Sequence, residues 1–225
     1  MPPAFARSRA VAALLTAALS LTLMAVMPQE AELSPGWRTP IIALELATSP
    51  ADVAFLAGEQ AAPLREAVDF GHAFDMVFPF AYAGLLLLTL LVSASAAGLR
   101  IAGSVVALVV VGADVRENLV LLELTERLSQ AAALDDLFSP LAAATWTKWI
   151  GIAALTALIG AARWSTARGR AALRFSLLAL TLVAAIVRTP LTGELMALAV
   201  VITIASFVVG ALLALRGSAT RADRT

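Results

Sequence analysis

The chain has 225 residues, of which 60% are hydrophobic and 14% are charged, and its formal net charge at pH 7 is zero. This composition is far more apolar than that of a soluble domain, and the balanced charge predicts no nucleic-acid partner. The chain has no cysteine and one histidine, so the sequence excludes disulfides and thiolate metal sites and predicts neither a histidine metal site nor a cofactor. Its many arginines and alanines are typical of a GC-rich bacterial genome.

Segments that are long and apolar enough to cross a bilayer follow one another along the chain. A spanning helix needs about 20 predominantly apolar residues, because the hydrocarbon offers the backbone no water. The sequence predicts about six such helices, at 10–27, 76–97, 101–124, 141–162, 171–187 and 195–215. The first also resembles a signal peptide, but no small-x-small cleavage site follows it, which favours a retained anchor. The expected fold is an all-α, polytopic membrane helix bundle forming a single membrane domain, 1–225.

The orientation of these helices follows from the positive-inside rule. The fifth segment, 171–187, is short and carries Arg174 near its start, where a long side chain can reach the interface. Omitting this segment would place the arginine-rich tail, 217–225, on the outer face, so the charge pattern favours about six spans and cytoplasmic termini. We expect this topology to be set mainly by a run of arginines, with anionic-lipid contact as a secondary role: Arg163, Arg168, Arg170 and Arg174.

The one long connection, 28–74, is predicted to be extracytoplasmic and is rich in acidic residues. Within it, Thr39-Pro40 and Ser49-Pro50 each place an N-cap residue before a proline at the first helical position. A third helix, from about 61 to 69, would lead into the second span. The sequence therefore predicts a loop that carries short amphipathic helices on the outer face of the bundle.

The third predicted span carries four ionisable residues, which are costly inside a membrane and indicate either function or a buried pair. Asp114, Glu117 and Asn118 stand at i, i+3 and i+4, so they share one helical face. Arg116 and Glu123 point to roughly the opposite side. At 1.5 Å per residue, Asp114 lies about 15 Å and Glu117 about 10 Å below the outer surface.

The neighbouring spans place further polar residues at a similar depth. Lys148, the only lysine of the chain, lies about 10 Å below the same surface, and an ion pair with Asp114 or Glu117 is its cheapest state. Asp75 lies at the outer rim of the second span, with Tyr82 deeper in the same helix. The sequence thus predicts a polar cluster or pocket in the outer half of the bundle, roofed by the loop: Asp75, Tyr82, Asp114, Glu117, Asn118 and Lys148.

Two interpretations of this polar cluster stay open. In the first it is a structural clamp, in which Lys148 neutralises one carboxylate and hydrogen bonds satisfy the rest. In the second it is a ligand or proton site, because two acids facing one base leave a carboxylate that can hold a proton. Nearby, Trp146 and Trp149 are interpreted as aromatic anchors at the interface, and His72 as a solvated loop residue.

Four elements of the chain resemble, in this order and spacing, an uncharacterised family of bacterial multi-pass integral membrane proteins. They are LELA at 44–47, DMVFPFAY at 75–82, ADVRENLVLL at 113–122 and TKW at 147–149. The Asp-x-x-Glu-Asn element is the most specific of them. The resemblance implies the same topology and points to the same polar cluster, without implying an established activity.

The leading functional hypothesis is a bacterial inner-membrane protein whose outward-facing polar pocket binds a small or amphipathic molecule without covalent chemistry. Its expected surroundings are membrane lipids. A first alternative is a proton-coupled transporter or permease, motivated by the intramembrane acids, although the chain shows no internal repeat. A second is an accessory subunit that docks a partner through the outer loop. A membrane enzyme acting on lipid, with Asp114 or Glu117 as general base, stays open, but no nucleophile or metal constellation supports it.

Overall fold

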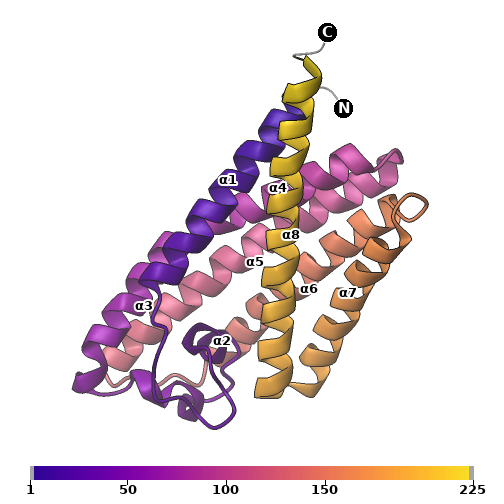
Figure 1. Cartoon of the computed structure of the whole chain (residues 1–225). Coiled ribbons are helices and arrows are strands. Elements are labelled where there is room, and N and C mark those ends of the chain that lie inside the picture. The colour runs from indigo at the N-terminus through magenta and orange to yellow at the C-terminus, as the bar shows by residue number, and fades with distance from the viewer. Residues whose placement is uncertain (1–2, 223–225) are drawn as a thin grey trace.

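The structure is a computed structural model that describes residues 3–222. It is all-helical, with 82% of the described residues in helix and no strand among them, which confirms the all-α part of the predicted fold class. Long helices run side by side, and both chain ends lie at one end of the bundle, opposite α2 (Figure 1). In chain order the helices are α1 (Pro3–Val26), α2 (Pro40–Glu45), α3 (Ala62–Asp75), α4 (Phe78–Ser93), α5 (Ala97–Ser129), α6 (Phe138–Ala162), α7 (Arg168–Val187) and α8 (Pro190–Ala222).

Among the described residues, five helical segments are long and apolar enough to cross a membrane. They are Arg7–Val26, Glu59–Ser93, Phe138–Ala162, Arg168–Val187 and Pro190–Arg216. The predicted segment 171–187 is therefore helical and of membrane length, despite Arg174. The helix α5 is not among the five, and its C-terminal half carries Asp114, Arg116, Glu117 and Glu123. Six spans thus stay a prediction that depends on α5.

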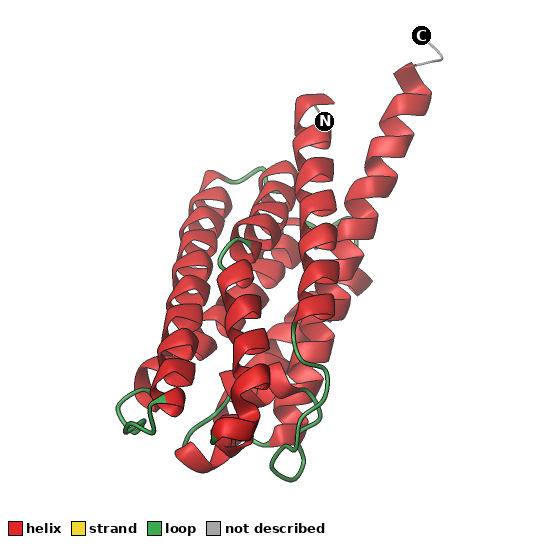
Figure 2. Ribbon diagram, turned by 90° about the vertical axis from the view of Figure 1, so that its left-hand side faces the viewer, coloured by secondary structure: helices red, strands yellow, loops and turns green. Residues whose placement is uncertain are grey.

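Two neighbouring helices, α4 and α6, pack against α5 and against each other. In the rest of the bundle, α1 packs against α4 and α8, and α7 packs against α6 and α8. Seen from the side, the long helices keep this near-parallel arrangement along the bundle (Figure 2). Fully buried leucines such as Leu86 and Leu155 form the core between them. A Cβ added at Gly103 would collide with the side chain of Leu90, so glycine is what lets α5 approach α4 closely.

The segment between α1 and α3 folds over the end of the bundle opposite the chain termini. Its short helix α2 and the 3-10 helix η1 (Pro50–Leu56) each begin with proline, as their N-cap sequences predict. Leu44, Val53 and Leu56 are buried there, in one hydrophobic cluster with Leu121 and Leu124 of α5. This segment is therefore a packed cap on the bundle.

The predicted loop 28–74 differs from the structure at its C-terminal end. Residues 62–75 form α3, so the helix predicted at about 61–69 extends to Asp75, and α4 follows it closely. A short break at Met76 and Val77 separates the two helices, just before Pro79, whose ring cannot continue a regular helix. At the other end of the chain, α8 extends to Ala222, so the predicted tail 217–225 begins as helix, and its last residues, 223–225, lie outside the described residues.

Candidate functional site

The structure brings the six predicted cluster residues together from four neighbouring helices. Asp75 ends α3, Tyr82 lies on α4, Lys148 lies on α6, and the rest lie on one face of α5. All but Asp75 are at most 5% exposed. The i, i+3, i+4 spacing on α5 is what turns Asp114, Glu117 and Asn118 toward α4 and α6 together.

The ammonium group of Lys148 is paired with two carboxylates. It contacts Glu117, one of its two predicted partners, and its Nζ lies 3.0 Å from Oε1 of Glu45. Its Nζ also lies 4.9 Å from the ring centroid of Trp149. Asp114, the other predicted partner, forms no ion pair with it within 4.0 Å. The lysine therefore ties α5 to α6 and both of them to the outer cap.

Sequence reasoning missed Glu45, which had been counted as one of several acids of the outer loop. It is 8% exposed, and its backbone carbonyl accepts a hydrogen bond from Thr145 Oγ1 of α6 at 3.0 Å. Burial raises the pKa of Glu45, against the opposing charge of Lys148. The signal available in the sequence was the LELA element itself, in which Glu45 is the one polar residue between apolar neighbours.

Asn118 is the centre of the remaining hydrogen bonds. Its Nδ2 donates to Oδ2 of Asp75 at 3.0 Å and to Oδ1 of Asp114 at 3.5 Å. The hydroxyl of Tyr82 donates to Oδ2 of Asp114 at 2.5 Å. Because the Asn118 amide donates to carboxylates, its oxygen is left to accept from Nδ1 of His72, 2.9 Å away. A carboxamide thus joins two acids and a histidine in one network.

The interpretation of His72 as a solvated loop residue is wrong, because the residue is 1% exposed and belongs to α3. Arg65, Val68 and His72 recur at helical spacing and are all buried against the bundle. That periodicity was the signal that could have placed His72 inside. Trp149 is likewise buried, at 7% exposure, so it packs in the core and is no interfacial anchor.

Charge and hydrogen bonding within the cluster are unbalanced. Four carboxyl groups face one lysine: Glu45, Asp75, Asp114 and Glu117. Three of the buried polar atoms have no hydrogen-bond partner, namely Oε2 of Glu45, Oε1 of Glu117 and Nε2 of His72. Among the residues described, no group of acids and histidines is arranged to hold a metal ion. The arrangement is suited to holding protons and to fixing the cap.

Two cavities lie beside the cluster, and neither is lined by any of the six predicted residues. The smaller, of about 230 Å³, lies under the outer cap, and its walls include Trp37, Glu45 and Asp52. The larger, of about 990 Å³, is an open groove along α5, α6 and the end of α7. Four residues line both: Thr48, Ala142, Trp146 and Arg188.

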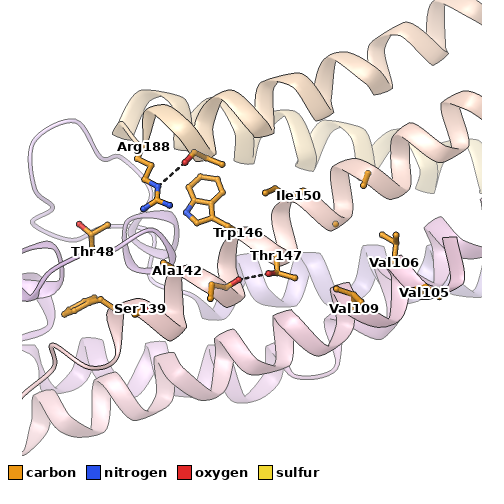
Figure 3. Close-up of a pocket in the computed structure, with 15 residues that line it drawn as sticks. Thr48, Val105, Val106, Val109, Ser139, Ala142, Trp146, Thr147, Ile150 and Arg188 are labelled. Atoms are coloured by element: carbon orange, nitrogen blue, oxygen red, sulfur yellow. Dashed lines mark hydrogen bonds between the residues drawn. The ribbon is translucent and has the colours of Figure 1, made fainter. Parts of the chain in front are cut away.

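The groove has a polar end and an apolar end (Figure 3). Thr48, Trp146 and Arg188 lie near one end, whereas Val105 and Val106 lie toward the other. Arg188 has left-handed backbone angles, φ 51° and ψ 43°, which cost energy for a residue with a Cβ. Its Nε donates to the carbonyl of Ala185 at 3.0 Å. This conformation places a cationic side chain at the mouth of an apolar groove.

Comparisons with protein-family models, with curated proteins and with solved structures found no match to this chain. The resemblance to a bacterial membrane-protein family therefore stays a prediction, which depends on the four sequence elements quoted above. What the chain does has to be inferred from its helices, its polar cluster and its two cavities.

Proposed function

We propose that this is a bacterial inner-membrane protein that crosses the membrane about six times, with both termini cytoplasmic, and that it binds a small amphipathic molecule at its outer face. The position of α5 supports the sixth span, because it packs against α4 and α6. Its 33 residues extend about 50 Å, more than the roughly 30 Å of hydrocarbon that a span must cross. Its acidic face is turned inward, where Asp114 and Glu117 are buried.

The four lining residues that the two cavities share are the observation that carries the ligand proposal. An amphipathic molecule needs an apolar surface and a polar one in contact with each other, and ligand pockets commonly measure about 300–1,000 Å³. The groove supplies apolar walls such as Val109 and Ile150. The shared residues Thr48 and Arg188 supply polar contacts where the groove meets the smaller cavity.

The buried cluster supports this site without lining it. Glu45 is the point of contact, because its carboxylate pairs with Lys148 and its residue also forms a wall of the smaller cavity. By holding α2 on the bundle, the ion pair keeps that cavity closed on one side. In this proposal the polar cluster is therefore the structural clamp, which is the first of the two interpretations given above.

The proposal is tested by blocking the groove from an exposed position. The variant Ala143→Trp places a large ring in the groove, which Ala143 lines from an exposed site on α6. Ala205→Trp is the matched control, since Ala205 is exposed on α8 and lines neither cavity. Each protein is reconstituted in nanodiscs with a single-chain amphiphile that carries a photoreactive diazirine, and the crosslinked peptides are mapped by mass spectrometry.

We expect saturable crosslinking of the peptides that contain 105–109 and 142–154, reduced about tenfold in Ala143→Trp, equivalent to about 1.4 kcal/mol. The Ala205→Trp control should resemble the wild type. Uniform, non-saturable labelling of all lipid-facing helices would contradict the proposal.

A proton-coupled transporter is the second candidate, and the excess of carboxyl groups favours it. Four acids around one lysine can exchange protons as a ligand binds or leaves. Flux measured in proteoliposomes under an imposed pH gradient separates the two candidates. A protein that only binds its ligand gives no flux above that of empty liposomes.

A further inference from the structure

Four arginines converge at the end of the bundle that holds both chain termini, far from the site described above. Arg9 comes from α1, Arg163 directly follows α6, and Arg170 and Arg174 come from the first turns of α7. The positive charges of Arg9 and Arg170 act on Arg163, and those of Arg163 and Arg170 act on Arg174. Burial, together with these like charges, lowers the pKa of Arg163. We call this group the arginine cluster.

The arginine cluster has no acidic partner among the residues described. None of its members has a carboxylate within ion-pair distance of 4.0 Å. The helices α1, α4, α6 and α7 contain no acidic residue at all. In α5 the first acid is Asp114, in the polar cluster, and the acid of α8 is Glu194, beside the outer cap. No described residue therefore supplies an anion that neutralises the arginine cluster.

Two members of the arginine cluster keep buried hydrogen-bond donors unsatisfied. Arg9 is 8% exposed, and its Nε has no partner, nor has Nη1 of Arg174. The other contacts of the cluster are neutral, since Arg163 donates to the hydroxyl of Ser93 at 2.7 Å and Arg174 lies 4.9 Å from the ring centroid of Phe207. Buried charged donors without a hydrogen-bond partner are unfavourable. An arginine that served only topology would extend into water, as the exposed Arg7, Arg168 and Arg170 do, whereas Arg9 is buried.

We propose that the arginine cluster binds the phosphate of an anionic phospholipid in the leaflet at this end of the bundle. Guanidinium groups form paired hydrogen bonds to phosphate oxygens, and basic pockets between membrane helices are suited to anionic lipid headgroups. The rings of Trp164 and Phe175 pack edge to face with centroids 6.0 Å apart and are 49% and 40% exposed. Such rings belong at the headgroup level, so the site lies at the depth of lipid phosphate.

The test uses the full chain in zwitterionic detergent micelles and measures its melting temperature. Phosphatidylglycerol, phosphatidylcholine or inorganic phosphate is titrated into the wild type, into Arg9→Gln/Arg174→Gln and into Arg7→Gln/Arg168→Gln. The last pair removes the same number of charges from the same two helices at exposed positions. Only the first pair removes the buried donors.

We expect phosphatidylglycerol to raise the melting temperature of the wild type and of the exposed control with saturation, and phosphatidylcholine to have little effect. The Arg9→Gln/Arg174→Gln variant should need at least tenfold more phosphatidylglycerol. An equal loss of stabilisation by phosphatidylglycerol in both double variants would overturn the proposed site. A rise in melting temperature with inorganic phosphate alone would overturn its assignment to lipid.

A second measurement covers the case in which the buried variant does not fold. Native mass spectrometry of the wild type, released from nanodiscs of equal phosphatidylglycerol and phosphatidylcholine content, should find about one tightly retained phosphatidylglycerol per chain. Retention of both lipids in equal amounts would overturn the proposal. Because the arginine cluster and the groove share no residue, either proposal can fail without the other.

Discussion

At the scale of single residues, Lys148 has the largest energetic role of the side chains described here. It is buried, and its pairs with Glu117 and Glu45 join α5, α6 and the outer cap. A buried ion pair contributes little compared with an apolar replacement, but removing one partner leaves an uncompensated charge and costs about 3–5 kcal/mol. The loss should be larger here, since two carboxylates would lose their common counter-charge.

Replacing the lysine gives a direct test of the clamp. We expect Lys148→Met, which keeps the length of the side chain, to lower the free energy of unfolding by at least about 3 kcal/mol. Adding Glu117→Gln should restore part of that loss and adding Glu45→Gln more, because each removes a buried negative charge. Unfolding in mixed micelles measures all four proteins. Unchanged stability in Lys148→Met would remove the buried-pair idea.

The six residues of the polar cluster could be predicted from spacing and depth. Two further residues that contact them, Glu45 and His72, could not. The helical repeat puts Asp114, Glu117 and Asn118 on one face, and equal depth brings Lys148 to them. Glu45 and His72 join through tertiary packing of a segment whose local sequence reads as a loop. A lysine inside a membrane predicts an acid, but nothing local says that the second acid comes from 103 residues earlier in the chain, at Glu45.

At the scale of elements, the six-residue helix α2 is too short to be stable alone and is held by its neighbours. Glu194 of α8 accepts hydrogen bonds from the backbone nitrogens of Arg38 and Thr39 at 2.9 and 2.8 Å, and from Oγ1 of Thr39 at 2.7 Å. These bonds fix the residues at the start of α2. The carboxylate of Glu194 thus accepts from the backbone nitrogen of the N-cap residue Thr39, which is the role of the N3 side chain in a capping box.

Loss of the three hydrogen bonds to Glu194 should loosen the cap formed by the segment between α1 and α3 without unfolding the bundle. We expect Glu194→Ala to speed trypsin cleavage after Arg38 several-fold, and Glu194→Gln to do so much less, because its amide oxygen can still accept from both backbone nitrogens. Cleavage after Arg127, which lies in the last turn of α5 and pairs with Asp136 at 2.6 Å, is the internal control. Equal rates after Arg38 in Glu194→Ala and wild type would contradict the role of Glu194.

The elements themselves were largely predictable, and the exceptions have physical causes. Apolar length identified the segments around α1, α4, α6, α7 and α8, because a bilayer selects on length and polarity alone. The helix α3 was predicted at about 61–69, but its extension to Asp75 and its packing against α5 were not, since its mixed composition satisfies a protein neighbour rather than lipid. The groove could not be predicted, because it arises from how α5, α6 and α7 diverge rather than from any local pattern.

At the scale of the whole molecule, the passage of α5 through the membrane decides the topology. The chain has no cysteine, so single cysteines report on one position each. Ser95 and Gln130 are exposed and lie just beyond the two ends of α5. In intact cells we expect a membrane-impermeant maleimide to label Gln130→Cys and to leave Ser95→Cys unlabelled, while a permeant maleimide labels both. Labelling of both positions by the impermeant reagent would show that α5 does not cross.

The unequal distribution of charge along the bundle determines how the membrane potential acts on the protein. Its net charge is zero, yet its described acids are gathered toward the segment between α1 and α3 and its arginine cluster lies at the opposite end, so the described part of the chain is an electric dipole along the bundle. Moving one elementary charge across a potential of 100 mV is worth about 2.3 kcal/mol. An energised membrane with a negative interior therefore favours the proposed orientation over the inverted one, and it does so for every charge that inversion would carry across.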